Sequence, residues 1–185
     1  MLGVVAATGI SLFGCAASDG QSTGPAAATT VTGPASAPSP GPTPSASGEP
    51  LADALQFSSA TVDGGTFDGA SLAGRPAVLW FWAAWCPRCR AAASHVAAVQ
   101  ADYASKVNVV GVAGLRSGRD SMTAFVRETG IGAFPSLADD EGAVWRKFGV
   151  TAQEFFVIVD SSGNVVHKGP LSSDELRDRV AALAG

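Results

Sequence analysis

The stretch that decides the fold reads AVLWFWAAWCPRC and runs from Ala77 to Cys89. Its first six residues, AVLWFW, are all apolar, and most of them are bulky side chains that favour β-structure. The run is short and is bounded by Pro76 on one side and Pro87 on the other. A short, bounded run of this kind predicts a buried strand in the centre of a sheet, here Ala77 to Trp82.

A helix is predicted directly after this strand, from about Pro87 to Tyr103, because the spacing of the apolar residues changes there. Its buried face carries side chains three or four positions apart, namely Cys89, Ala93, Val96, Val99 and Tyr103. Pro87 suits the first turn of the helix, where a missing N–H group removes no hydrogen bond. The predicted strand is therefore followed by a helix that begins at the two cysteines.

Cys86 and Cys89 lie where this helix begins. The helix macrodipole and the free N–H groups of the first turn stabilise a thiolate at Cys86. Cys89 follows about one turn later and is close enough to close a small disulfide ring. The pattern predicts a dithiol redox centre.

Three other interpretations of the cysteine pair remain: half of a zinc site, a haem attachment site, or a structural disulfide. A zinc site needs a second pair of ligands, and His95 and His167 offer no matching spacing. Haem attachment needs a histidine directly after the second cysteine, where Arg90 stands. A disulfide across so short a loop adds little stability. We therefore favour the redox interpretation.

The composition allows one packed domain with appendages, since the chain has 185 residues of which 46% are hydrophobic. The formal net charge is −4 and no basic block occurs, so we do not expect nucleic acid as a partner. Only three cysteines are present, and the third, Cys15, lies far from the pair. No apolar run reaches the roughly 20 residues that a transmembrane helix needs.

The N-terminal region is expected to consist of two parts without a core of their own. Residues 1–15 resemble a signal peptide whose end, Leu12-Phe13-Gly14-Cys15, is similar to a bacterial lipobox, so we expect lipidation of Cys15. The alternative is a cleaved secretory signal with an incidental cysteine. Residues 16–50 are rich in Pro, Ala, Ser, Thr and Gly and are expected to form a disordered tether that spaces the domain from a membrane.

Residues 51–185 are expected to form the globular domain, of the α/β class. The expected strands are Leu55–Val62 and Thr66–Asp68, joined as a hairpin by Asp63-Gly64-Gly65, followed by Val107–Val112, Phe155–Val159 and Val165–Lys168. The expected further helices are one capped by Ser121 that runs to Thr129 and ends at Gly130, a short one at Val144–Phe148, and Asp174–Leu183 capped by Ser172 or Ser173. This order predicts a mixed sheet covered on both faces.

The order of elements, with WCxxC closing the first central strand, resembles the thioredoxin fold. More narrowly, the chain resembles the extracytoplasmic TlpA/DsbE-type thiol–disulfide oxidoreductases, especially the secreted or lipid-anchored actinobacterial members of the DsbE and DsbF kind. The resemblance covers Leu55 to Ala184 and rests on DGGTFDGASLAGRPAVLWFWAAWCPRC, VNVVGVAG, LADDEGAVWRKFGV and VIVDSSGNVVHKG. It implies a central mixed sheet flanked by helices, with an N-terminal β-hairpin extension, and no cofactor besides the dithiol.

The resemblance implies that Cys86 is the nucleophile and Cys89 the resolving thiol. Trp85 precedes the nucleophile and would shield it or simply pack there. Pro87 and Arg88 lie between the cysteines, and the cation of Arg88 would favour the thiolate, unless it is only a solvated surface charge. We assign no chemistry to the remaining charged and aromatic candidates, which are Trp80, Phe81, Trp82, Arg90, His95, Arg116, Arg119 and His167.

The chain departs from the family pattern beside the dithiol. Glu154 stands where the family usually has a cis-proline, just before the strand at Phe155. Because a cis bond before a non-proline residue costs about 2.5–4 kcal/mol, we expect a trans bond between Gln153 and Glu154. The carboxylate, if it points at Cys86, would accept a proton.

Three further positions depart from the family pattern, because Ala92, Ser94 and Trp80 replace an acid, a kinking proline and a buried acid, respectively.

These features predict an extracytoplasmic thiol–disulfide oxidoreductase that acts on exported cysteine-containing proteins. It would work with a membrane or soluble redox partner and be held to the cell membrane by the lipid on Cys15, or be secreted if Cys15 carries none. Two alternatives remain open. One is a reductant for cytochrome c maturation, and the other is a binding module whose dithiol is nearly redox-silent.

Overall fold

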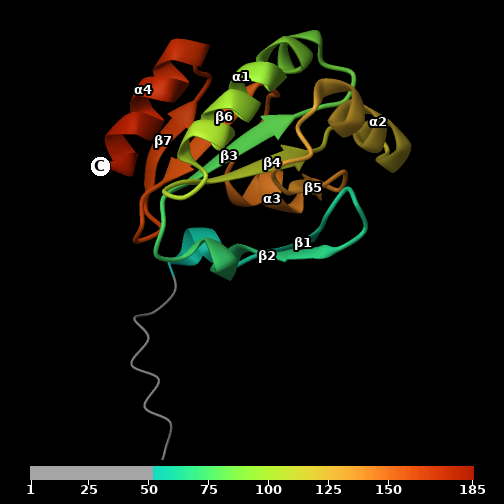
Figure 1. Cartoon of the computed structure of the whole chain (residues 1–185). Helices are drawn as coiled ribbons and strands as arrows, with labels where there is room; N and C mark the ends of the chain where they lie inside the picture. Colours follow the sequence, from blue (N-terminus) through green and yellow to red (C-terminus); the bar gives the residue numbers. More distant parts are fainter. Residues whose placement is uncertain (1–51) are drawn as a thin grey trace, which may run out of the picture. The chain divides into compact units, whose positions relative to one another are not determined.

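A computed structural model describes residues 52–185 (Figure 1). The expected signal peptide at residues 1–15, including Cys15, and the tether at residues 16–50 lie outside the described residues. Within residues 52–185 no helix is both long and apolar enough to cross a membrane.

Five strands form the central sheet in the order β5-β4-β3-β6-β7. Their bounds are β3 Ala77–Trp82, β4 Asn108–Ala113, β5 Ser136–Ala138, β6 Phe155–Val159 and β7 Val165–Gly169. β3, β4 and β5 run parallel, whereas β6 and β7 are antiparallel to their neighbours. All six residues of β3 are buried, which confirms the prediction of a central buried strand.

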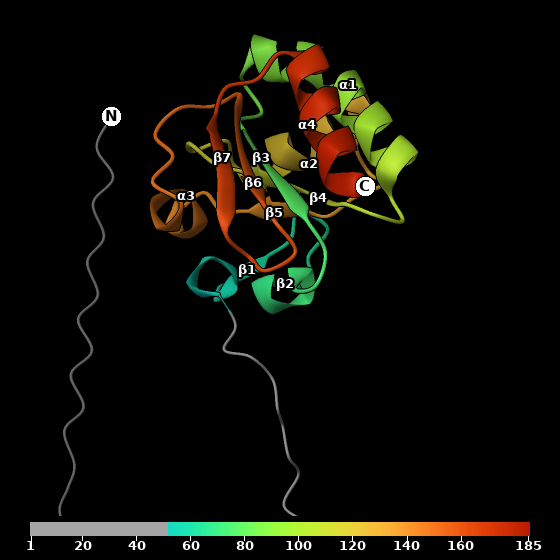
Figure 2. The same cartoon turned by 90° about the vertical axis from the view of Figure 1, so that its left-hand side faces the viewer.

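Helices cover both faces of this sheet, as predicted (Figure 2). One face packs on α1 Pro87–Tyr103, α2 Arg119–Thr129 and α4 Ser173–Ala184, and the other packs on the short helix α3 Ala143–Lys147 and on two 3-10 turns, Asp53–Leu55 and Gly69–Leu72. The side chains of β3 alternate between the two layers, with Trp80 and Trp82 under α1 and α2 and Phe81 toward α3. β3 therefore contributes side chains to both core layers.

A two-stranded hairpin, β1 Ser58–Ala60 and β2 Thr66–Asp68, lies beside the edge strand β5. Its first strand is shorter than the expected Leu55–Val62, because Leu55 belongs to a 3-10 turn and is buried in the layer under α3. Thr61 forms an isolated antiparallel bridge to Leu137 of β5. The Arg119 guanidinium donates hydrogen bonds to the carbonyls of Thr61 and Val62, at 2.9 and 3.1 Å. Arg119 thus ties α2 to the hairpin instead of being only a solvated charge.

The start of α2 differs from the prediction. The helix begins at Arg119 after Gly118, whose φ is 75°, and Ser121 is not its cap. The Asp140 carboxylate holds the preceding turn, because its oxygens accept the N–H groups of Ser117 and Gly118, each at 2.8 Å. The helix ends as predicted at Gly130, which is left-handed with φ 73°.

The strand β5 and the helix α3 also differ from the prediction. The sequence did not predict β5, whose three residues pair with β4 over Gly111 to Ala113 and are too few to show a pattern. The short helix α3 starts one residue earlier than expected, because the buried Asp139 carboxylate accepts the N–H groups of Ala143 and Trp145 at 2.8 and 2.9 Å.

The start of α4 resolves the choice between the two serines. The Ser172 hydroxyl accepts the N–H of Glu175 at 3.3 Å, and the Glu175 carboxylate accepts the N–H of Ser172 at 2.8 Å. This reciprocal pair is a capping box. Ser172 is therefore the cap, and Ser173 is the first helical residue.

Ser172→Ala should lower the free energy of unfolding by about 1 kcal/mol, since it removes the acceptor for a free helix N–H group. Ser173→Ala serves as the matched control and should be close to neutral, because alanine is the better helix former at a helical position. Urea denaturation of both variants measures the difference. Equal losses in the two variants would contradict the assigned cap.

Candidate active site

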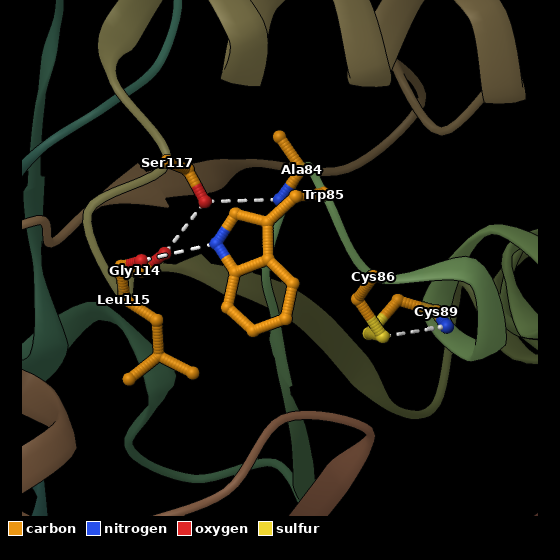
Figure 3. Close-up of a disulfide and its surroundings, with 7 residues drawn as sticks. All are labelled: Ala84, Trp85, Cys86, Cys89, Gly114, Leu115 and Ser117. Atoms are coloured by element: carbon orange, nitrogen blue, oxygen red, sulfur yellow. Dashed lines mark hydrogen bonds between the residues drawn. A yellow bond between two sulfur atoms is a disulfide. The ribbon is translucent and has the colours of Figure 1, made fainter.

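The two cysteines lie where β3 hands the chain to α1, and they form a disulfide with their Cα atoms 5.3 Å apart (Figure 3). Cys86 is the N-cap of α1, and its Sγ accepts a hydrogen bond from the N–H of Cys89 at 3.1 Å. Pro87 occupies the first turn, as predicted. The sulfur of Cys86 is therefore held against the positive end of the helix, where negative charge is stabilised.

Cys86 is buried, although it lies at the start of a helix. In the disulfide form this residue is only 3% exposed, and Cys89 is completely buried. The reason is the N-cap geometry, which turns the Cys86 sulfur back toward the Cys89 N–H group instead of out to solvent. A partner thiol must therefore approach over the residues that surround the disulfide.

The loop after β4 is tied to the residues that precede the disulfide (Figure 3). The Trp85 indole N–H donates to the carbonyl of Leu115 at 3.1 Å, although the Trp85 side chain is 56% exposed. The Ser117 hydroxyl accepts the N–H of Ala84 at 2.9 Å and donates to the carbonyl of Gly114 at 2.6 Å. These three bonds hold the exposed indole in one orientation beside the dithiol.

This loop carries backbone strain. Leu115 and Arg116 both have left-handed φ angles, 57° and 56°, a conformation that costs an ordinary residue roughly 1–2 kcal/mol. The bonds of Ser117 to Ala84 and Gly114, together with the two N–H groups held by Asp140, keep the loop in this form. The sequence alone does not indicate that this loop supports Trp85, because the short Gly114–Gly118 turn carries no distinctive motif.

Glu154 lies in the loop before β6, and it is 7% exposed. Its N–H donates to the carbonyl of Phe81 at 2.9 Å, which continues the pairing of β3 with β6 by one bond. Its φ is 58°, in the left-handed region. A proline has no N–H and holds φ near −65°, so this backbone suits a non-proline residue and would have to be rebuilt to accept one. The trans bond between Gln153 and Glu154 stays a prediction.

The Glu154 carboxyl is buried without complete pairing. Its Oε2 has no hydrogen-bond partner, and neither has the indole Nε1 of Trp80. Burial raises the pKa of Glu154, while the nearby cation of Arg88 lowers it to a smaller extent. The resemblance placed a buried acid at position 80. In this chain a tryptophan stands there, and Glu154 brings a carboxyl close to it from the loop before the neighbouring strand β6.

The structure also locates the residues to which we assigned no chemistry. Trp80, Phe81 and Trp82 are fully buried core residues. Arg90 pairs with Glu128 at 3.1 Å and lies 5.1 Å from the centre of the Phe125 ring.

Two further candidates lie on α1 and β7. His95 is exposed on α1 and shares with Glu154 the lining of a cavity of about 10 Å³. The ring of His167 contacts the carbonyl of Gly169 at 3.3 Å. Residues 52–185 contain no cluster of three side chains suited to a metal ion.

Comparisons with known proteins agree with this geometry. The AhpC/TSA family model matches residues 50–168. The soluble secreted antigen MPT53 of Mycobacterium tuberculosis is 41% identical over 133 residues, which cover 70% of this chain and 75% of that protein. DsbF of M. tuberculosis, solved in mixed oxidised and reduced forms, has a TM-score of 0.68 and 47% identity, covering 72% of this chain and 99% of that one. The thiol:disulfide interchange protein DsbE of Yersinia pestis is 30% identical over 134 residues, or 72% of this chain and 67% of that protein.

Glu154 should make stability depend on pH. Its pKa is raised in the folded state, so the folded protein binds this proton more tightly than the unfolded chain does. The resulting stability is complete below the ordinary carboxyl pKa and is lost as pH rises through the raised one. Glu154→Gln removes this loss, because its amide stays neutral at every pH, so the variant should gain stability over the natural protein as pH rises.

Thermal or urea unfolding across pH 4 to 8 measures the difference between Glu154→Gln and the natural protein. Arg88 lies near the carboxyl and His95 lines the same cavity, so the comparison is repeated in a His95→Asn background to separate the effect of Glu154 from that of the imidazole. A difference that stays constant with pH would show that the carboxyl has an ordinary pKa.

Proposed function

The chain belongs to the AhpC/TSA family and is a thioredoxin-like thiol–disulfide oxidoreductase, and on this premise we propose that it exchanges disulfides with exported cysteine-containing proteins. The observation that carries the proposal is the Cys86–Cys89 disulfide at the N-terminus of α1. This placement lowers the free energy of the Cys86 thiolate, which is both the attacking group and the leaving group of the exchange.

In the oxidising direction, a thiolate of the partner attacks Sγ of Cys86, and the bond between Cys86 and Cys89 breaks. Cys89 leaves as a thiolate and takes up a proton. The second thiolate of the partner then attacks the partner sulfur that is bonded to Cys86. This closes a disulfide in the partner and releases Cys86 as a thiolate. Two electrons pass from the partner to the protein, and the reducing direction reverses these steps.

Three side chains support the proposed exchange. Arg88 lies in the first turn of α1, where its cation favours the Cys86 thiolate and therefore the reduced form. Glu154 is a buried carboxyl whose pKa is raised by burial, which favours the uptake of a proton. Trp85 would cover the disulfide from the side of the Leu115 loop.

A trapping experiment tests the exchange. Reduced Cys89→Ser protein, mixed with an oxidised peptide, should accumulate a mixed disulfide at Cys86, because no second thiol can resolve it. The matched variant, reduced Cys86→Ser, should form almost none, since Cys89 is completely buried. Mass spectrometry measures both adducts.

Turnover distinguishes an enzyme from a binding module. The natural protein should catalyse insulin reduction or the refolding of a scrambled substrate, whereas a binding module would bind without turnover. Equal trapping by Cys86→Ser and Cys89→Ser, together with no turnover, would overturn the proposed function.

We further propose an extracytoplasmic location. MPT53 is named a soluble secreted antigen, and the N-terminal sequence of this chain resembles a signal peptide ending at Cys15. If Cys15 is lipidated, the natural protein should fractionate with membranes and Cys15→Ala should move to the soluble or secreted fraction. Identical partitioning of the two forms would rule out the lipid anchor and leave a secreted protein.

A further inference from the structure

The surface that a partner must cross to reach the disulfide is built from two segments. We call it the dithiol face and define it by Ala84, Trp85, Arg88, Leu115 and Arg116, all exposed or half-buried. Trp85 lies between the two segments, since it precedes Cys86 in the chain and hydrogen-bonds to Leu115. The face therefore has a fixed apolar centre, with one arginine contributed by each segment.

Within the described residues no ion pair engages either arginine of this face, although the buried Glu154 carboxyl lies near Arg88. Neither Arg88 nor Arg116 forms an ion pair within 4 Å in residues 52–185, and Arg116 makes no hydrogen bond there. Other surface arginines behave differently, since Arg90 pairs with Glu128 at 3.1 Å and Arg177 pairs with Asp102 at 2.6 Å. The two cations of the dithiol face are thus free to meet charge on a partner.

The acidic groups near this face do not neutralise it. Both oxygens of Asp140 are taken by backbone N–H groups of the loop. Glu154 is buried, so its carboxyl is not presented to a partner on this surface. Asp120 is the nearest exposed acid along the chain after Arg116, and it lies in the first turn of α2. The face is therefore basic, although the whole chain has a net charge of −4.

We propose that the dithiol face selects partner segments in which an acidic residue lies beside the reactive cysteine. The partner's carboxylate pairs with Arg116 or Arg88, and its neighbouring apolar side chains lie on the exposed indole of Trp85. The left-handed backbone at Arg116 and the bonded indole hold both contacts in place before the partner arrives. This inference rests on the proposed exchange reaction and names the class of its substrates.

The selectivity should be modest and sensitive to salt. Exposed charge pairs contribute little each and act mainly on the rate of encounter, so we expect about two- to fivefold per charge. The Debye length falls from roughly 30 Å at 0.01 M to 3 Å at 1 M salt, so the preference should almost disappear at the higher concentration.

The test uses the full oxidised chain and three short cysteine peptides that differ only in the residues beside the cysteine, which are Asp, Asn or Lys. Stopped-flow tryptophan fluorescence gives the rate of thiol attack. Each rate is divided by the rate of the same peptide with an uncharged disulfide, bis(2-hydroxyethyl) disulfide, because neighbouring charges also change the pKa of the peptide thiol. The normalised rate should fall from Asp to Asn to Lys.

Two variants assign the effect to the dithiol face. Arg116→Glu should cancel the preference for the Asp peptide, because its negative charge offsets the cation of Arg88, while Arg179→Gln, at an exposed arginine of α4, should leave the order unchanged. Arg88 is not used for this purpose, since its substitution also changes the chemistry of Cys86.

Equal normalised rates for the three peptides, or an unchanged order in Arg116→Glu, would overturn the inference and leave the exchange reaction standing. If none of the peptides reacts, the proposed function fails and the inference fails with it. The two failures therefore give different results.

Discussion

The chemistry of the dithiol depends on the way β3 is anchored. This strand is hydrogen-bonded to β4 along one edge and to β6 along the other, and every residue of it is buried. Because α1 follows the strand after a short connection, the anchored strand also fixes where the helix begins. Cys86 can then cap α1 and keep its sulfur against the N–H of Cys89. A strand free on one edge would not hold this geometry against thermal motion.

The same anchoring makes the unusual loop at Glu154 possible. Its N–H extends the pairing of β6 with β3 by one bond, to Phe81. The residue is nevertheless left-handed, buried, and left with one unpaired carboxyl oxygen. Each of these features costs stability. Such costs concentrate at functional sites, where the surrounding structure is rigid enough to maintain them.

The second strained segment is the loop after β4, and it is held by polar side chains instead of strand pairing. Asp140 and Ser117 take up the backbone groups of a loop that contains two successive left-handed residues. The result is a rigid, basic dithiol face over a disulfide that is itself buried. Exchange requires a partner sulfur in line with the disulfide. A rigid dithiol face therefore limits which partner proteins can reach the disulfide.

The sequence by itself was sufficient for the features that depend on local pattern. The apolar run from Ala77 to Trp82 predicted the buried strand, the helical spacing after Pro87 predicted α1, and the glycine at position 130 marked the end of α2. Together with CxxC, they also predicted the dithiol at a helix terminus. Local pattern is enough here because strand burial and helix ends depend on residues close in the chain.

Only the tertiary structure decided the features that depend on distant contacts. β5 exists because β4 lies beside it, and α2 begins at Arg119 because Asp140 holds the preceding turn. The burial of Cys86, the left-handed Glu154 and the bond from Trp85 to Leu115 likewise join segments far apart in sequence or follow from the packing around them. No local pattern encodes these contacts, because the same residues would be solvated if their distant partners were absent.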